Sequence, residues 1–136
     1  MAFMIHAYVD GEVRPWQYLA ADDGTYTVGQ ACVINGGHIV PVSSGVGEDT
    51  DEGAHYICMA NATIATDGDL LPVVQCDEEV IWEAPLSVNS SSIAIGTSYT
   101  ISSAGTGVTA TTTKGVFKVL EYDGKTAGDL VRGIIV

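Results

Sequence analysis

The sequence is short of positive charge. Five lysines and arginines stand against 17 aspartates and glutamates, so the 136 residues carry a formal net charge of −12. Nucleic acids and anionic membranes are bound through lysine and arginine side chains that displace counterions. We therefore expect neither a nucleic acid nor a membrane as a partner. The acidic balance favours solubility at high concentration, or a basic partner surface.

Targeting and membrane signals are missing as well. The N-terminal residues show no basic segment followed by an apolar core and a cleavage site, which is the pattern of a signal peptide. No apolar run approaches the length of a membrane span. The three cysteines, Cys32, Cys58 and Cys76, lack metal-type spacing and leave at least one thiol unpaired. We expect reduced, mostly buried thiols in a protein that folds in a reducing cytoplasm.

Helical periodicity is also absent, because no window repeats apolar residues at the spacing of an amphipathic helix. The 16 glycines, beside many threonines, serines and valines, favour short strands and tight turns. The length is that of one domain, and a hydrophobic content of 46% is enough for a core. The sequence therefore predicts a compact all-β domain.

Motifs for catalysis or metal binding are not found. There is no nucleophile elbow and no Walker pattern, and the dinucleotide-like letters at 105–110 have no following helix to bind a phosphate. The acidic segments 48–52 and 67–69 could offer oxygen ligands to calcium, but neither fits the EF-hand loop. The histidines stand alone in the sequence: His6, His38 and His55. We expect no enzyme activity, no cofactor and no metal requirement for folding.

The most informative positive feature is an internal repeat. Residues 28–41 form two apolar runs around Asn35-Gly36-Gly37, a hairpin turn signal, and residues 95–110 repeat the order of glycine, strand, small-residue turn and second strand. An aromatic strand and a Gly-Asp-Leu segment follow each hairpin. We predict two similar four-strand halves, 28–76 and 95–135, joined by a crossover at 77–94. The matched landmarks are Gly29 with Gly96, Tyr56 with Phe117, and Asp69 with Asp129.

Residues 1–27 differ from the rest of the chain, because they are rich in aromatic side chains and broken by turn residues and Pro15. We expect an extended N-terminal arm ahead of a single β-domain at 28–136. The aromatic side chains of such an arm serve either as an ordinary part of the core or as a strap that binds a partner. The candidate partner-binding residues are Phe3, Tyr8, Trp16 and Tyr18.

Several segments together resemble the small capsid decoration (cement) proteins of tailed phages and prophages. These segments are the hairpin 33–40, the strand 70–74 after a Gly-Asp pair, the run Val-Ile-Trp-Glu-Ala-Pro at 80–85 and the apolar ending at 132–136. The last two are similar to the lambdoid type of decoration protein. The resemblance implies a β-barrel or β-tulip domain without catalytic residues. It also implies self-association, with a trimer as the first choice, and docking onto the major capsid protein. Such a protein is made in the bacterial host cytoplasm, and it stabilises the shell from the virion surface against internal pressure.

Two other classes of protein stay open. A secreted or surface β-sandwich that binds carbohydrate or adhesin partners fits the strand-rich composition, although the missing signal peptide and the unpaired thiol count against it. A small β-barrel enzyme with a site assembled only in space is the third reading, and the lack of any convergent constellation in the sequence counts against it.

Overall fold

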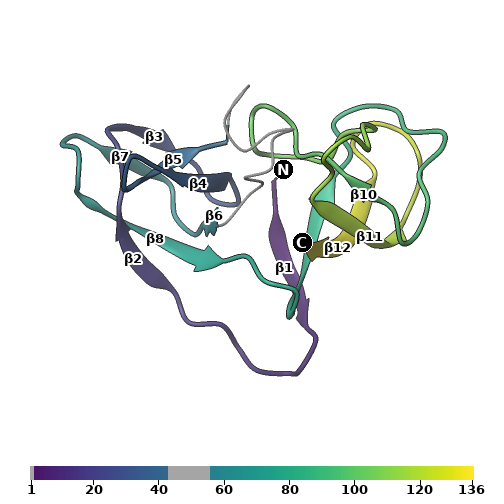
Figure 1. The fold of residues 1–136 in the computed structure, drawn as a ribbon, viewed down its shortest axis with the longest axis horizontal. Helices are drawn as coiled ribbons and strands as arrows, with labels where there is room; N and C mark the ends of the chain where they lie inside the picture. The colour runs from purple at the N-terminus through teal and green to yellow at the C-terminus, as the bar shows by residue number, and fades with distance from the viewer. Residues whose placement is uncertain (1, 43–55) are drawn as a thin grey trace.

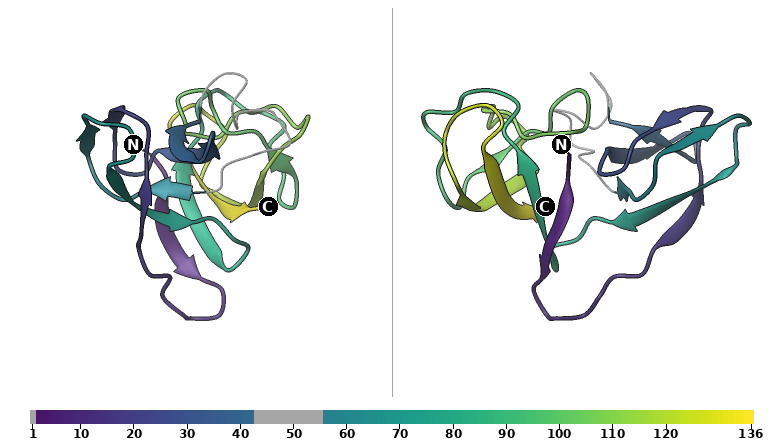
Figure 2. Two further views of the ribbon diagram at one scale, coloured as in Figure 1. Left: turned by 60° about the vertical axis from the view of Figure 1, so that its left-hand side comes forward. Right: turned by 180° about the vertical axis from the view of Figure 1, so that it is seen from behind.

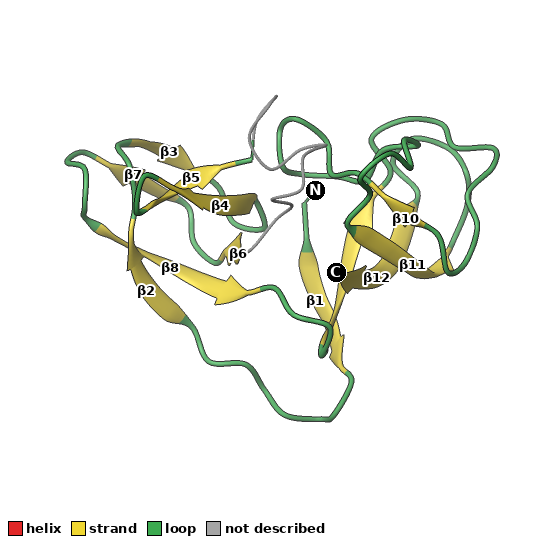
Figure 3. Ribbon diagram, in the orientation of Figure 1, coloured by secondary structure: helices red, strands yellow, loops and turns green. Residues whose placement is uncertain are grey.

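The computed structural model describes residues 2–42 and 56–136, and every regular element in these residues is a β-strand (Figure 3). The predicted all-β class is confirmed. No helix in the described residues could cross a membrane. His55 and the acidic segment 48–52 lie outside the described residues.

The strands form two five-stranded antiparallel sheets and one two-stranded sheet. The first large sheet has the order β1-β9-β12-β11-β10, with bounds Met4–Tyr8, Val80–Pro85, Leu130–Ile135, Phe117–Tyr122 and Ser98–Tyr99. The second has the order β2-β8-β6-β4-β5, with bounds Gln17–Ala20, Leu70–Gln75, Tyr56–Cys58, Ala31–Asn35 and His38–Pro41. The small sheet pairs β3 (Gly24–Tyr26) with β7 (Ala62–Ile64).

The molecule has two lobes (Figures 1 and 2). The first lobe contains β2 to β8, and the second lobe contains β1 and β9 to β12. Strands β2, β8, β6 and β4 of the first lobe hold the places that β9, β12, β11 and β10 hold in the second. The pairing registers match residue for residue: Leu19↔Leu71 with Ala84↔Val131, Tyr56↔Gln75 with Phe117↔Ile135, and Ala31↔Ile57 with Ser98↔Lys118.

Backbone hydrogen bonds outside the strands repeat in the same way. The N–H of Gly29 donates to the Cys58 carbonyl at 2.7 Å, and the N–H of Gly96 donates to the Val119 carbonyl at 2.7 Å. Likewise, Ala21 donates to Asp69 at 3.0 Å and Leu86 to Asp129 at 2.9 Å. The landmarks matched in the sequence thus occupy matching places in the two lobes.

The repeat boundaries differ from the predicted ones. Strand β2 pairs with β8 as β9 pairs with β12, so the matching segments run over 17–75 and 82–135. Residues 77–94 therefore contain an inner strand, β9, in addition to a connection. The sequence could not reveal this match, because Gln-Tyr-Leu-Ala at 17–20 and Trp-Glu-Ala-Pro at 82–85 share no residue at equivalent positions.

The segment expected to form an arm is built into the sheets. Residues 4–26 supply β1, β2 and β3, which pair with β9, β8 and β7. Phe3 is buried, and its ring lies 5.9 Å from that of Phe117 between centroids. Burial of this ring and the ladder of strand pairs offset the entropy lost on ordering these residues, which an isolated arm could not do.

In the described residues, each lobe has a single parallel bridge. In the first lobe it joins the residue after β2 to β5, the two edge strands of the sheet, whereas in the second lobe it joins the residue after the inner strand β9 to a residue outside the named strands. These bridges are Ala21↔Ile39 in the first lobe and Leu86↔Val108 in the second. A lone bridge does not continue the hydrogen-bonded ladder, and no closed barrel forms in the described residues. The expected barrel or β-tulip closure is therefore not seen.

The described residues contain two apolar core clusters. The larger one joins side chains of both lobes, among them Val33, Ile57, Trp82 and Phe117. The smaller one lies within the first lobe and includes both Cys32 and Cys58. These two thiols are buried, Cys76 is half-buried, and all three are free. Burial raises the pKa of Cys32 and of Cys76 above the ordinary thiol value, as expected for thiols that act as small apolar side chains.

Candidate docking surface

The pairing of β2 with β8 sorts their side chains onto two faces. In a strand, successive side chains point to opposite faces, and directly paired residues share a face. Leu19 pairs with Leu71, which is fully buried, so this face points into the core. The other face carries the pairs Tyr18↔Pro72 and Ala20↔Leu70.

This second face is apolar and exposed. Tyr18 is 60% exposed and Leu70 is 62% exposed, and Trp16, two positions before Tyr18, is 50% exposed. We call Tyr18, Ala20, Leu70 and Pro72, together with Trp16 just ahead of β2, the β2/β8 outer face. It contains no charged side chain. Large exposed aromatic and aliphatic side chains gathered on one face mark an interaction site more often than scattered ones do.

The equivalent face of the second lobe carries charged side chains in place of apolar ones. The registers match Tyr18 with Glu83 and Pro72 with Arg132. There the guanidinium of Arg132 donates from Nε to Glu83 Oε2 at 2.8 Å and from Nη1 to Glu121 Oε1 at 2.6 Å. It also donates from Nη1 to Asp123 Oδ1 at 2.9 Å and from Nη2 to Asp123 Oδ2 at 3.2 Å. Hydrogen bonds to Asp123 and Glu83 raise the pKa of Arg132, so this face is a permanently charged network.

The structure separates the four predicted partner-binding residues. Phe3 is buried and Tyr8 is partly buried against the larger core cluster, so both contribute to packing. Trp16 and Tyr18 are exposed on the β2/β8 outer face. Sequence reasoning did not include Leu70 and Pro72. Their signal was the alternation of the Leu70–Gln75 strand, in which the residues between and after them, Leu71 and Val73, are fully buried.

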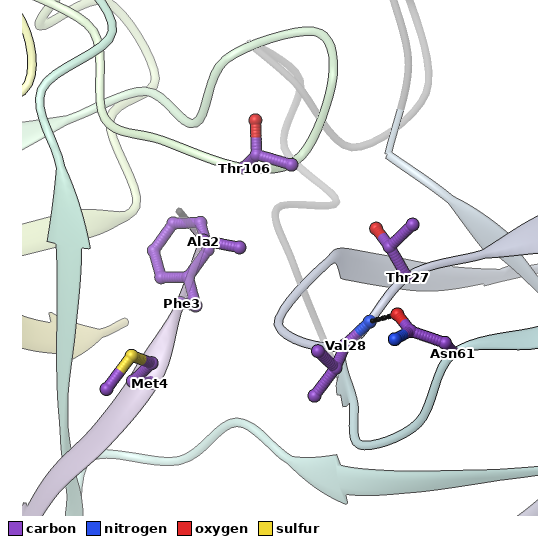
Figure 4. A pocket seen from close by; sticks show the side chains of 7 residues that line it. All are labelled: Ala2, Phe3, Met4, Thr27, Val28, Asn61 and Thr106. Atoms are coloured by element: carbon purple, nitrogen blue, oxygen red, sulfur yellow. Dashed lines mark hydrogen bonds between the residues drawn. The ribbon is translucent and has the colours of Figure 1, made fainter.

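A pocket of about 380 Å³ lies beside the N-terminal residues (Figure 4). Its lining consists of Ala2, Phe3, Met4, Thr27, Val28, Asn61 and Thr106. The Asn61 Oδ1 atom accepts a hydrogen bond from the Val28 N–H at 2.9 Å, so its strongest acceptor is already used. The lining supplies no acid, base or thiol, and we assign it no chemistry.

Carboxylates gather near the C-terminal end of β2. The Asp23 N–H donates to Asp67 Oδ1 at 2.7 Å, and His38 Nδ1 lies 2.8 Å from Asp22 Oδ1. A hydrogen bond with Asp67 raises the pKa of Asp23, whereas the backbone hydrogen bond from Asp23 lowers the pKa of Asp67. In the described residues, no group of three or more side chains has the geometry of a metal site. The described residues therefore provide no set of ligands that would support calcium binding at 67–69.

The second histidine of the described residues also faces a carboxylate. His6 Nδ1 lies 3.7 Å from Glu83 Oε2, at the rim of the Arg132 network. Within residues 2–42 and 56–136, neither histidine is hydrogen-bonded to a nucleophilic side chain, and the imidazole of His38 bonds to Asp22. The two imidazoles are thus explained as partners of carboxylates on the sheet surface.

Comparisons with protein-family models, with curated proteins and with solved structures gave no match. The function must therefore be argued from the surface of the molecule.

Proposed function

We propose that the protein is a non-enzymatic structural protein of a tailed phage or prophage, which decorates the capsid shell and stabilises it. It docks onto the major capsid protein through the β2/β8 outer face. The observation that carries this proposal is the contrast between the two lobes: the same face is a charged network in one and an exposed apolar surface with Tyr18 and Leu70 in the other. A face that departs in this way from its own duplicate has a partner.

The charge of the chain suits a protein that acts in many copies. Subunits with a net charge of −12 repel one another in solution and stay dispersed before docking. Apolar burial contributes about 25 cal/mol per Å², so one small face binds weakly. Self-association, with a trimer as the first arrangement by resemblance, turns several weak sites into tight binding through multivalency.

The proposed place of action is the outer surface of the virion, after synthesis in the cytoplasm of the bacterial host. Three free thiols, two of them fully buried, are compatible with folding in a reducing compartment. The apolar docking face favours an apolar counterpart on the shell protein, and the acidic net charge of the chain favours basic side chains around that counterpart.

The test is co-sedimentation with expanded heads assembled from the major capsid protein of the same phage or prophage, with solution mass measured in parallel. We expect saturable binding to expanded heads and little binding to unexpanded ones. Leu70→Lys places a charge on the docking face and should abolish binding. Ile95→Lys changes a side chain of similar exposure, 67% against 62%, in the second lobe and should bind as the unmodified chain does. Equal binding of the two variants would refute the docking face.

A carbohydrate-binding module is the second candidate, because Trp16 and Tyr18 are exposed aromatic side chains near one another in the chain and could stack on sugar rings. Affinity electrophoresis in gels that contain bacterial polysaccharide tests it. Retardation that disappears in Trp16→Ala, together with no binding to heads, would favour this candidate over capsid decoration.

A further inference from the structure

Comparison of the two lobes reveals one strand edge, that of β2, which lacks the partner strand present in the other lobe. In the second lobe, β9 lies between β12 and β1, and β1 pairs with it antiparallel through Met4↔Glu83 and Ile5↔Trp82. Strand β2 holds the place of β9 in the first lobe. In the described residues, no strand pairs with the outer side of β2 along Gln17–Ala20, and β2 ends its sheet (Figures 1 and 2). Directly after β2, the Ala21↔Ile39 bridge and the Asp22 N–H, which donates to the Ile39 carbonyl at 2.9 Å, bring β5 to this edge. One lobe thus has a five-residue strand at a place where the other has none.

The backbone of β2 presents hydrogen-bonding groups at this edge. Pro72 has no N–H, and its carbonyl accepts from the Met59 N–H at 3.0 Å, on the side of β6. The Tyr18↔Pro72 pair is therefore a non-hydrogen-bonded pair of the ladder. Because the N–H and C=O of one strand residue point the same way, those of Tyr18 point away from β8. Its counterpart Glu83 offers the same two groups to Met4 of β1.

We propose that the outer edge of β2 binds an extended polypeptide strand of the shell protein, antiparallel to β2, in the place that β1 holds on β9. The strand adds to the sheet and covers Tyr18 with its side chains. This inference deepens the proposed function and rests on it for the source of the strand. The geometry of the edge stands without it.

Charge sets the direction and sequence of the bound strand. The C-terminal end of β2 leads into Asp22 and Asp23, and Asp22 is paired with His38 at 2.8 Å. Asp67 accepts from the Asp23 N–H, so the Asp23 and Asp67 carboxylates keep this end acidic. At the other end, Arg14 is already paired with Asp10 at 3.4 Å and Asp77 at 3.2 Å. Because β5 already holds the edge at Ala21 and Asp22, an antiparallel strand stops pairing at Ala20, and the residues ahead of its paired part lie toward Asp23 and Asp67. The occupant therefore has lysine or arginine ahead of an alternating apolar segment.

A second copy of this chain fits the edge less well. Its β1 is held by β9 and by the buried Phe3, so lending β1 to a neighbour would open one edge to fill another. Pairing β2 with β2 of a second copy would bring together two chains that each carry a net charge of −12. A basic strand from a different protein would leave β1 in place on β9, and it would not bring together two acidic chains.

The test uses synthetic peptides and the full chain. The first peptide, Lys-Lys-Ala-Phe-Met-Ile-His-Ala-Tyr, puts two lysines ahead of residues 2–8, so that its methionine faces Tyr18 in the β1 register. The second peptide has the same residues with both lysines at the C-terminal end. Calorimetry should show binding of the first at least tenfold tighter than that of the second. Emission from the exposed Trp16 should shift to the blue, because Trp82 is already buried.

Backbone variants locate the site without relying on side chains. N-methylation of the peptide methionine removes an N–H directed at β2 and should abolish binding, whereas N-methylation of the isoleucine, directed away, should change affinity less than threefold. In the protein, Tyr18→Pro removes the outward N–H without a ladder bond to β8 and should lose binding. Tyr18→Val keeps the N–H and should retain most of the affinity.

Each remaining outcome overturns the inference. It fails if neither peptide binds, if both bind equally, or if Tyr18→Pro binds as the unmodified chain does. If the chain has a doubled solution mass and Tyr18→Pro abolishes the doubling, the β2 edge pairs with a second copy of the chain and not with the shell protein. If the first peptide binds in the predicted register and the unmodified chain fails to sediment with heads, the edge is a strand acceptor but the shell protein is not its source, and the proposed function fails separately.

Discussion

At the scale of single residues, the repeat provides its own controls. Gly29 and Gly96 hold the same place in the two lobes, with φ angles of 84° and 86°. A Cβ atom on Gly29 would lie 2.6 Å from the Phe3 carbonyl oxygen, because residues 2 and 3 pass over it. A Cβ atom on Gly96 would meet nothing within 4 Å. Strain from positive φ is shared by the two positions, and crowding is confined to one.

We therefore predict that Gly96→Ala lowers the free energy of unfolding by about 1–2 kcal/mol, the cost of a positive φ. Gly29→Ala should lose a further 1–3 kcal/mol or so, because overpacking displaces residues 2 and 3. Urea unfolding of both variants measures the difference. Equal losses would contradict the placement of the N-terminal segment on the first lobe.

The phenol of Tyr26 sets an alkaline limit on stability. Its oxygen lies 2.8 Å from the Asp22 carbonyl and 3.0 Å from the Ile39 carbonyl, in the core of the first lobe. Burial raises the pKa of Tyr26 from 10.0 to about 12. The unfolded chain releases this proton first, so its contribution is intact below pH 10 and is lost as the pH rises through 12.

We predict that the free energy of unfolding falls by about 1.4 kcal/mol per pH unit for this tyrosine over that window. The thiols of Cys32 and Cys76, whose pKa values are raised above 9.0, start the loss of stability at lower pH. Urea midpoints measured from pH 8 to 12 test this. Tyr26→Phe should flatten the curve above pH 10, and an unchanged slope would show that the phenol ionises freely in the folded state.

At the scale of elements, the charged face of the second lobe is a cross-strand network. Arg132 of β12 reaches Glu83 of β9 and Glu121 of β11, and the side chains of Arg132 and Glu83 are only 14% and 16% exposed. Removal of the guanidinium takes away the 2.8 Å hydrogen bond to Glu83 and leaves this mostly buried carboxylate with the longer contact to His6 at 3.7 Å. This differs from the Arg14 pairs, whose acids are 38% and 41% exposed.

We predict that Arg132→Met destabilises the fold by about 1–3 kcal/mol, the usual cost of stranding a partly buried charge. Arg14→Met should cost clearly less, because exposed pairs are screened by water. Thermal unfolding at low and high salt compares the two variants. A double change of Arg132→Met with Glu83→Gln should recover part of the loss. No recovery would mean that the arginine acts by packing alone.

The elements also show how far the sequence could predict the fold. The Asn35-Gly36-Gly37 hairpin and the Gly29 and Gly96 turns are local, and turn chemistry identified them. The equivalence of β2 with β9 is visible only in how they pair with β8 and β12, because the two strands share no residue at equivalent positions. The candidate site divides in the same way. Aromatic content identified Trp16 and Tyr18, but only the ladder with β8 brings Leu70 and Pro72 beside them.

At the scale of the whole molecule, the N-terminal residues bind the fold together. Deleting residues 1–20 would remove β1, β2 and the buried Phe3, and would open edges in both large sheets. We predict that this truncation loses its cooperative thermal transition and its near-ultraviolet circular dichroism, since loss of a buried Phe alone costs about 3–5 kcal/mol. A truncated chain that still unfolds cooperatively would support the sequence-based prediction of an arm separate from the β-domain. Point variants on the docking face are the cleaner functional test.

Under the proposed function, the two lobes present different faces to the shell and to solvent. A shared core fixes them together, one duplicate presents charge, and the other presents Trp16, Tyr18 and Leu70 beside an open strand edge. On a shell, this arrangement directs the first lobe inward and leaves the Arg132 network facing water. Each copy would then dock in one orientation.

Electron cryomicroscopy of expanded heads saturated with the protein tests this claim most directly. The account predicts protein density at symmetry-related lattice positions, with Trp16, Tyr18 and the β2 edge against the shell and the Arg132 network facing outward. Heads that carry no added density at saturation would contradict it, and so would copies bound through the charged face with Trp16 and Tyr18 in solvent.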